Sequence, residues 1–407
     1  MNREPIGRRC VTGLLLASLA LLPTVSAAQE SEPPKRLIPL DGPPVAMSLA
    51  RVSPDWELSF TSPEGPRRLG ADQVVFWGSW REPDRGSIVL LRSGDLLVGY
   101  DLHLPGEQLA FDSDSLGQVS IPMDAVAGLI FQLPSEAARR DRLMSRVLAE
   151  TDRQTRLLLT GGDTVSGSLA GIEPDGVMLQ TEAGSLRLPL DRVTALVQPG
   201  GRDLHQRAKA VRALVGLEDG SRLTCKGLVV TEKEARLDTS LGQFAVAADR
   251  VCALQPTSEK IVYLSDLEAA SYRQIPFLSI AWPYRRDRSV TQTLLRSGGA
   301  LYLKGLGTHS AARLTYELDQ TYRRLDMELA LDESAGNRGS VIYRVFSDNG
   351  SGQWQERYSS PVVRGGASPI AASADLAGAK RISLLVEFAD RGDELDHANW
   401  LNARLVR

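Results

Sequence analysis

The sequence predicts an all-β protein in which tandem small β-barrel modules are followed by a β-sandwich of jelly-roll type. Three observations favour this fold: a pattern that recurs four times, short runs of alternating apolar and polar residues between turn residues, and helical spacing confined to connecting segments. The 407 residues, 43% of them hydrophobic, suffice for several domains and are not of disordered composition. A formal net charge of -3 with interspersed Arg and acidic residues argues against nucleic-acid binding.

Residues 1–28 are predicted to be a signal peptide. Arg8 and Arg9 supply its positive start, residues 11–22 its apolar centre, and small residues at 25–28 a cleavage site. This apolar run is shorter than the roughly 20 residues of a membrane-spanning helix, although an uncleaved anchor stays an alternative. We therefore expect an exported bacterial protein, periplasmic or extracellular, without a membrane span after cleavage.

The repeated pattern begins at four glycines. It reads GPRRLGADQV, GQVSIPMDAV, GSLRLPLDRV and GQFAVAADRV, starting at Gly65, Gly117, Gly184 and Gly242, with Asp seven residues after each Gly and Val two after the Asp. Gly-Asp and Asp-Gly turns between alternating apolar runs are typical of hairpins. The spacing of strands and turns resembles that of small SH3-like or Sm-like barrels. Such barrels would act either as interaction modules or as an array of spacers.

The pattern divides the chain after the signal peptide into modules. The predicted small β modules cover residues 29–85, 86–134, 155–200 and 201–257, the last including a short connector. A connector helix is predicted over 135–154, where Leu143, Val147 and Leu148 form an apolar stripe. The jelly roll is predicted over 258–407, where short strands continue without a convincing helix.

Two cysteines, Cys225 and Cys252, remain after the predicted cleavage. In an oxidising compartment such a pair favours a disulfide. Two small buried thiols are the alternative. Two cysteines alone cannot form a four-ligand zinc site.

Residues 259–407 carry an ordered series of short motifs. YLSDL starts at Tyr263, GLGTH at Gly305, DE at Asp332 and DHANW at Asp396. The series resembles the NPCBM family, carbohydrate-binding modules first noted beside glycoside hydrolase family 98 enzymes. The resemblance implies a galactose-binding-like jelly roll that recognises a glycan, with galactose-containing glycans as one class and a calcium ion near the site in some members.

A sugar offers hydroxyl groups for hydrogen bonds and an apolar ring face for stacking, so its site combines aromatic rings with polar side chains. The predicted carbohydrate-binding residues are Trp282, Tyr284, His309, Asp332, Glu333, Asp396, His397 and Trp400. Alternatives stay open at this point: Trp400 as core, His309 as a buried turn residue, and Asp396 with His397 as a structural pair.

No cofactor is required by this prediction. Asp332, Glu333, Asp393 and Glu394 could supply oxygen ligands to a structural Ca²⁺, but no EF-hand spacing supports such a site.

The sequence contains no His-Glu-x-x-His motif, no Gly-x-Ser-x-Gly elbow and no P-loop. It therefore predicts a non-catalytic glycan-binding protein. An envelope assembly protein, whose jelly roll binds a protein partner and no sugar, is the alternative. A glycoside hydrolase or its accessory subunit is favoured less.

Overall fold

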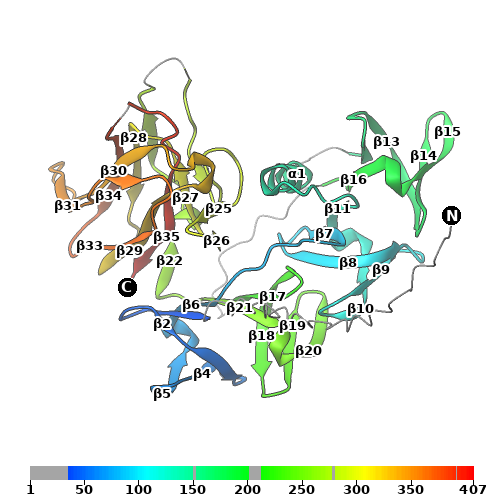
Figure 1. Cartoon of the computed structure of the whole chain (residues 1–407), viewed down its shortest axis with the longest axis horizontal. Coiled ribbons are helices and arrows are strands. Elements are labelled where there is room, and N and C mark those ends of the chain that lie inside the picture. Colours follow the sequence, from blue (N-terminus) through cyan, green and yellow to red (C-terminus); the bar gives the residue numbers. More distant parts are fainter. Residues whose placement is uncertain (1–34, 150–152, 201–211, 277–279, 391) are drawn as a thin grey trace, which may run out of the picture. The chain divides into compact units, whose positions relative to one another are not determined.

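The computed structural model describes residues 35–149, 153–200, 212–276, 280–390 and 392–407 (Figure 1). Nearly all elements are β-strands, which confirms the all-β prediction. Within these residues α1 (Ala137–Ala149) is the single α-helix, and it lies inside the predicted connector. None of the helices in this described part is long and apolar enough to cross a membrane. The predicted signal peptide lies outside the described residues.

Four units of strands precede the C-terminal sandwich. The first contains β1 (Arg36–Pro39), β2 (Val45–Ala46), β3 (Ser48–Val52), β4 (Glu57–Ser62), β5 (Gly65–Gly70), η1 (Ala71–Gln73) and β6 (Val74–Gly78). The second contains β7 (Ser87–Leu91), β8 (Leu96–His103), β9 (Gln108–Ser113), β10 (Gly117–Pro122), η2 (Met123–Ala125) and β11 (Val126–Ile130). The third contains β12 (Thr155–Leu159), β13 (Thr164–Glu173), β14 (Gly176–Thr181), β15 (Gly184–Pro189), η3 (Leu190–Arg192) and β16 (Val193–Val197). The fourth contains β17 (Arg212–Leu217), β18 (Arg222–Val230), β19 (Glu234–Thr239), β20 (Gly242–Ala247), η4 (Ala248–Arg250) and β21 (Val251–Thr257).

The second, third and fourth units share one antiparallel pairing scheme. The first strand of a unit pairs with its second and fifth strands, the second with the third, and the third with the fourth. A short 3-10 turn precedes each fifth strand. The identification of these units as SH3-like or Sm-like barrels, and their exact boundaries, stay predictions.

The Gly, Asp and Val of the repeated pattern recur for different structural reasons. The glycines begin the last strand but one of each unit with φ between 71° and 119°, a left-handed conformation that favours glycine. The aspartates lie within η1 to η4, and the valines begin the last strand of each unit with at most 2% of their surface exposed. The pattern therefore encodes a tight hairpin, a turn and the first core residue of the closing strand.

The units pair with one another through their last strands. β6 of the first unit pairs with β21 of the fourth, and β11 of the second pairs with β16 of the third. Figure 1 shows β6 (blue) beside β21 (green), although about half the chain separates them. The first and last copies of the tandem pattern are thus neighbours in space.

Cys225 and Cys252 are free, buried thiols, so the predicted disulfide is wrong for this structure. Cys225 lies on β18 and Cys252 on β21, and β17 pairs with both strands and separates them. The two side chains also belong to different apolar clusters, Cys225 to the main core of the four units and Cys252 to a small cluster around Trp80. Burial raises the pKa of Cys252 to about 12, with neighbouring charges contributing less, and keeps the thiol protonated.

The C-terminal part is a sandwich of two antiparallel sheets. One sheet contains β22 (Ile261–Tyr263), β24 (Arg285–Arg286), β27 (Gly305–Thr308), β29 (Arg324–Leu331), β33 (Ile370–Asp375) and β35 (Ala398–Val406). The other contains β23 (Ser271–Gln274), β28 (Ala312–Glu317), β30 (Ser340–Asp348), β31 (Gln355–Ser359), β32 (Val363–Arg364) and β34 (Arg381–Phe388). β25 (Leu295–Ser297) and β26 (Ala300–Tyr302) form a separate hairpin, and η5 (Leu264–Asp266) and η6 (Glu333–Ala335) are short turns. Leu329, Tyr343 and Trp400 from the two sheets meet in one apolar core.

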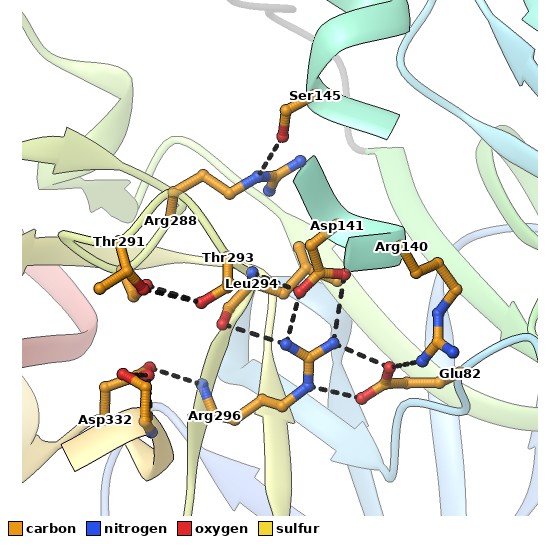
Figure 2. Close-up of polar contacts among 12 residues, drawn as sticks. Glu82, Arg140, Asp141, Ser145, Arg288, Thr291, Thr293, Leu294, Arg296 and Asp332 are labelled. Atoms are coloured by element: carbon orange, nitrogen blue, oxygen red, sulfur yellow. Dashed lines mark hydrogen bonds and ion pairs between the residues drawn. The ribbon is translucent and has the colours of Figure 1, made fainter. Parts of the chain in front are cut away.

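The β25–β26 hairpin joins the sandwich to the preceding units through charged groups. Arg296 donates to both oxygens of Glu82, at 2.7 and 2.8 Å, and to both oxygens of Asp141, at 2.5 and 3.2 Å (Figure 2). Arg140 also pairs with Glu82, and the backbone N–H of Leu294 donates to Asp141 at 2.8 Å. Glu82, Arg140, Asp141 and Arg296 are called the ion cluster below.

Apolar contacts surround the ion cluster. Leu294 of the sandwich belongs to the same buried cluster as Ile88, Met144 and Val147. Leu301 and Leu303 pack against that cluster and against Trp80. The ionic contact therefore lies among side chains that exclude water, where an unpaired charge is costly.

Candidate functional site

Three aromatic rings gather where several loops of the sandwich meet. The Trp282 and His309 rings stack with centroids 5.0 Å apart and planes 4° from parallel. The His397 ring lies 5.9 Å from Trp282 and 6.0 Å from His309, tilted to both. We call these three side chains the ring cluster.

The strand order of the sandwich explains why these residues meet. His309 follows β27, and His397 immediately precedes β35, which pairs with β27. Thr308 faces Ala398 in that pairing, so the two histidines leave the same end of adjacent strands. Trp282 reaches them from the segment between β23 and β24.

Backbone conformation reinforces the two histidine turns. Ala311 has φ of 55° and Leu395 has φ of 54°, left-handed conformations that are unusual for residues other than glycine. Such local strain often accompanies functional sites, where surrounding structure holds it in place.

Hydrogen bonds hold the rings in position. The backbone N–H of Trp282 donates to Gln274 Oε1 at 2.7 Å, and the Tyr272 hydroxyl donates to the backbone carbonyl of Trp282. The Ser334 hydroxyl lies 2.9 Å from His397 Nδ1 and donates to Asp332 at 2.7 Å. These supports fix the rings on a β framework before any ligand arrives.

Electrostatics keep both histidines neutral near pH 7. Burial, followed by the charge of His397, lowers the pKa of His309 to about 4. Burial also lowers the pKa of His397, and the nearby Asp332 carboxylate only partly opposes it. A neutral imidazole has one donor and one acceptor nitrogen, the combination that pairs with a sugar hydroxyl.

Asp396 lies behind the rings and is fully buried. Its carboxylate accepts the Ser340 N–H at 2.8 Å. Burial raises its pKa to about 6 against the opposing effect of hydrogen bonds from Ser340 and Ser310. The side chain connects the loop before β35 to the start of β30.

Acidification is expected to destabilise the protein through His309. The folded-state pKa of about 4 lies below the ordinary 6.5, so the unfolded chain takes up the proton first. The stability from His309 is present above pH 6.5 and is lost as the pH falls towards 4, at a cost of up to about 3 kcal/mol. Asp396 acts oppositely, because its raised pKa gives stability below 3.8 that is lost as the pH rises through 6.

Urea unfolding between about pH 7 and pH 4 checks this expectation. His309→Gln should lose less stability on acidification than the wild type. His103→Gln, at an exposed position outside the ring cluster, controls for removing a histidine. Identical pH profiles for wild type and His309→Gln would contradict the assignment.

Asp332, Glu333 and Trp400, which were also predicted to bind the glycan, lie outside the ring cluster and have other contacts in the structure. Asp332 is 2% exposed, caps η6 through Ser334 and accepts from Asn399 at 3.0 Å. Glu333 is exposed, but accepts the Gly299 N–H at 2.8 Å and so supports a neighbouring turn. Trp400 is wholly buried, with its ring 4.8 Å from that of Tyr343, and is a core residue.

Tyr284 is also away from the ring cluster. Its ring lies 5.1 Å from Tyr272 and packs against the sandwich core. Tyr272, Gln274, Ser310 and Ser334, which support or adjoin the rings, were missed by the sequence analysis. Only Ser310, directly after the GLGTH motif, carried a local signal.

The predicted calcium ligands do not fit a calcium site. Asp332 and Glu333 are occupied as just described, and Glu394 pairs with Arg338 at 2.8 Å. Within the described part of the chain, no group of three or more His, Cys, Asp or Glu could hold a metal ion. Calcium needs about six to eight oxygen ligands, and the side chains of Asp332, Glu333 and Glu394 are committed to other partners.

A β-sandwich with stacked rings and hydrogen-bonding groups at the end of its strands has the features of a carbohydrate-binding module. Residues 260–406 match the family described as NPCBM/NEW2 domain, which confirms the resemblance seen in the sequence. The C-terminal third of the chain therefore carries the match to the NPCBM/NEW2 domain.

Curated relatives and solved structures are similar to part of this chain. The Alpha-1,3-galactosidase B of Akkermansia muciniphila is 30% identical over 122 residues, 29% of this chain and 15% of that protein. A CBM51 from Clostridium perfringens GH95 in complex with methyl-galactose is 23% identical, with a TM-score of 0.31, covering 36% of this chain and 99% of that one. The CBM51-2 in complex with GlcNAc and INT domains of Clostridium perfringens ZmpB are 24% identical, with a TM-score of 0.32, covering 44% of this chain and 37% of that one. The chain spans only 11% and 15% of the two curated relatives it matches.

Proposed function

We propose that this chain is an exported, non-catalytic protein that binds a glycan at the ring cluster of its C-terminal module. The observation that carries the proposal is the stack of Trp282 on His309 beside His397, two neutral imidazoles beneath a partly exposed indole. The family match of residues 260–406 supports carbohydrate as the ligand.

The geometry suggests how a sugar would be held. Trp282 offers its exposed surface to the apolar face of a sugar ring, while imidazole nitrogens form hydrogen bonds with sugar hydroxyl groups. Few such contacts are available to a single sugar, so affinity for a monosaccharide should be low. The galactosidase name of the Akkermansia relative supports galactose-containing glycans as the first class to test.

Calorimetric titration of the full chain with galactose-containing oligosaccharides tests the proposal. Trp282→Ala should weaken binding at least about tenfold, because the stacking surface is lost. Trp354→Ala is the matched control, since this tryptophan lies near the opposite end of β30, between Arg313 and Arg381. We expect the control to bind like the wild type.

Three outcomes would contradict parts of the proposal. A blank glycan array from folded protein would favour the envelope assembly alternative, especially if a protein partner were captured stoichiometrically. Release of reducing sugar from a polysaccharide panel would contradict the non-catalytic part. Recovery of the protein in the cytoplasmic fraction would contradict export.

A further inference from the structure

A cavity of about 440 Å³ lies between the first unit and the sheet of the sandwich that contains β29. One wall comes from residues 36–44, which include β1 and the turn after it. The opposite wall comes from β29, β33 and β35. A volume of this size accommodates a small-molecule ligand.

The wall from β29 carries two buried carboxylates. Side chains alternate along a strand, and Leu325, Met327 and Leu329 pack into the core of the sandwich. Asp326 and Glu328 therefore lie on the other face, which lines the cavity, and yet they are only 9% and 6% exposed. A buried carboxylate is costly unless hydrogen-bond donors satisfy it.

The two carboxylates differ in how well they are satisfied. Asp326 accepts from Arg324 at 2.9 Å and from the Ser373 hydroxyl at 2.7 Å. Glu328 has three donors, all near the upper limit of hydrogen-bond length: Asn402 at 3.3 Å, Tyr302 at 3.4 Å and Arg36 at 3.5 Å. Since a carboxylate has about four acceptor positions, Glu328 can still accept strong hydrogen bonds from a ligand.

Arg404 is the matching donor on β35. It is 7% exposed and lines the cavity. Among the described residues it donates one hydrogen bond, from Nη1 to the Asn402 carbonyl at 3.2 Å, and its Nη2 lies 3.6 Å from Asp326. Its Nε is buried without a hydrogen-bond partner in the same part of the chain. A guanidinium has five N–H donors, so most of those of Arg404 are available to a ligand or left unsatisfied.

A bulge in β35 brings these groups together. In the pairing of β29 with β35, Asp326 faces Arg404 but Glu328 faces Leu401, so β35 has one extra residue at this point. Asn402 lies in the bulge with φ of 49°, a left-handed conformation that is uncommon outside glycine. Bulges are frequent next to active sites, where they redirect a side chain. Because Asn402 contacts both Glu328 and Arg404, the acceptor and the donor lie on either side of one residue.

The charges of the cavity wall balance. Its charged residues are three arginines and three acids: Arg36, Arg324, Arg404, Asp41, Asp326 and Glu328. A ligand with a single charge would leave one charge in excess in this partly buried site, which is costly. A ligand with one positive and one negative group keeps the balance.

We propose that this cavity binds a small zwitterion, a free amino acid, whose ammonium group donates to Glu328 and whose carboxylate accepts from Arg404 and Arg36. Hydrogen bonds between charged groups are shorter and about twice as strong as those between neutral groups, so this ligand satisfies both side chains better than a hydroxyl group does. The side chains of Ile38, Leu40 and Pro44 in the opposite wall leave room for an apolar substituent.

The cavity is separate from the ring cluster. His397 immediately precedes β35, whereas Arg404 lies near the end of that strand. The proposal therefore does not depend on glycan binding at the ring cluster.

Calorimetric titration of the full chain at neutral pH and constant ionic strength tests this site. The probes are alanine, leucine and glutamine, with leucinamide, N-acetylleucine and galactose as ligands that lack the carboxylate, the ammonium group or both. We expect saturable binding of at least one amino acid. Leucinamide and N-acetylleucine should bind at least about tenfold more weakly than leucine, because each lacks one charged contact.

The variant Glu328→Gln keeps the size of the side chain and removes its charge. It should weaken amino-acid binding at least about tenfold and abolish the preference for leucine over N-acetylleucine. Glu173→Gln is the matched control, since Glu173 pairs with Arg187 in the third unit and does not line the cavity. Arg36→Gln is a second test, because this side chain is 45% exposed and its replacement should leave the fold intact while weakening binding several-fold.

Trp282→Ala should keep amino-acid binding, so failure of the ring cluster and failure of this site are distinguishable. Absence of saturable binding by all three amino acids would overturn the proposal. Galactose binding that Glu328→Gln weakens would replace the zwitterion by a neutral sugar. Amino-acid binding that is unchanged in folded Glu328→Gln and Arg36→Gln would place the ligand elsewhere and also overturn the proposal.

Discussion

Replacing Arg296 with alanine is expected to lower the free energy of unfolding by about 3–5 kcal/mol, because removing one partner of a buried ion pair leaves its counter-charge unpaired. Arg296 is 13% exposed, and its partner Asp141 has no exposed side-chain surface. Burial tends to raise the pKa of Glu82, but hydrogen bonds and charge from Arg296 and Arg140 outweigh it and lower that pKa. Urea unfolding at neutral pH measures the effect.

The matched control for this change is Arg323→Ala. Arg323 also donates to a carboxylate at 2.9 Å, that of Asp41, but both side chains are more than half exposed. Exposed pairs contribute about 0–1 kcal/mol, so this control should scarcely change stability. Arg296→Ala with Asp141→Asn completes a double-mutant cycle, and a coupling energy near zero would contradict the role of the ion cluster.

Replacing Gly78 with alanine is expected to cost about 2–5 kcal/mol, from a left-handed backbone penalty and from overpacking. Gly78 has φ of 100°, and an added Cβ would overlap the carbonyl oxygen of Cys252 on the paired strand β21. The contact lies where the first unit pairs with the fourth, so the variant tests that pairing.

Gly242→Ala separates the two causes of this loss. Gly242 has a similar φ of 118°, but nothing lies within 4 Å of an added Cβ. Its replacement should therefore cost only the backbone penalty of about 1–2 kcal/mol. Equal losses for the two variants, measured by thermal or urea unfolding, would argue against close packing of β6 on β21.

Local sequence patterns predicted many elements. Turn residues indicate the preferred backbone conformation, and alternation of apolar and polar residues indicates which face of a strand is buried. The turn glycines and the valines of the repeated pattern lie at hairpin turns and at strand starts, as the pattern predicted. The helix stripe was incomplete, because Met144 is buried beside Val147 while Leu143 and Leu148 are only partly buried. Residues 303–304 separate β26 from β27, where Gly305 begins the pairing with β35.

The candidate site was predicted only in part. Trp282, His309 and His397 lie together, whereas Asp332 and Trp400 from the same motifs support the fold. A motif places all its residues near one another, but exposure depends on which side of a turn each side chain occupies. Gln274 and Ser334, which hydrogen-bond to Trp282 and His397, match no motif in the sequence. A hydrogen bond to a loop requires only one polar residue within reach, so no particular spacing marks such a residue.

The sequence by itself determined the all-β class, the four repeated units and the kind of module at the C-terminus. These features depend on side-chain alternation, on turn glycines and on an ordered series of motifs. Only the tertiary structure decided that the first unit pairs with the fourth, that the two cysteines stay apart, and that Arg296 meets carboxylates 155 and 214 positions away. Edge strands of similar units present the same hydrogen-bonding groups, so no local pattern determines which two units pair. Charged side chains likewise pair wherever folding brings them together. Both kinds of pairing therefore depend on the assembled chain.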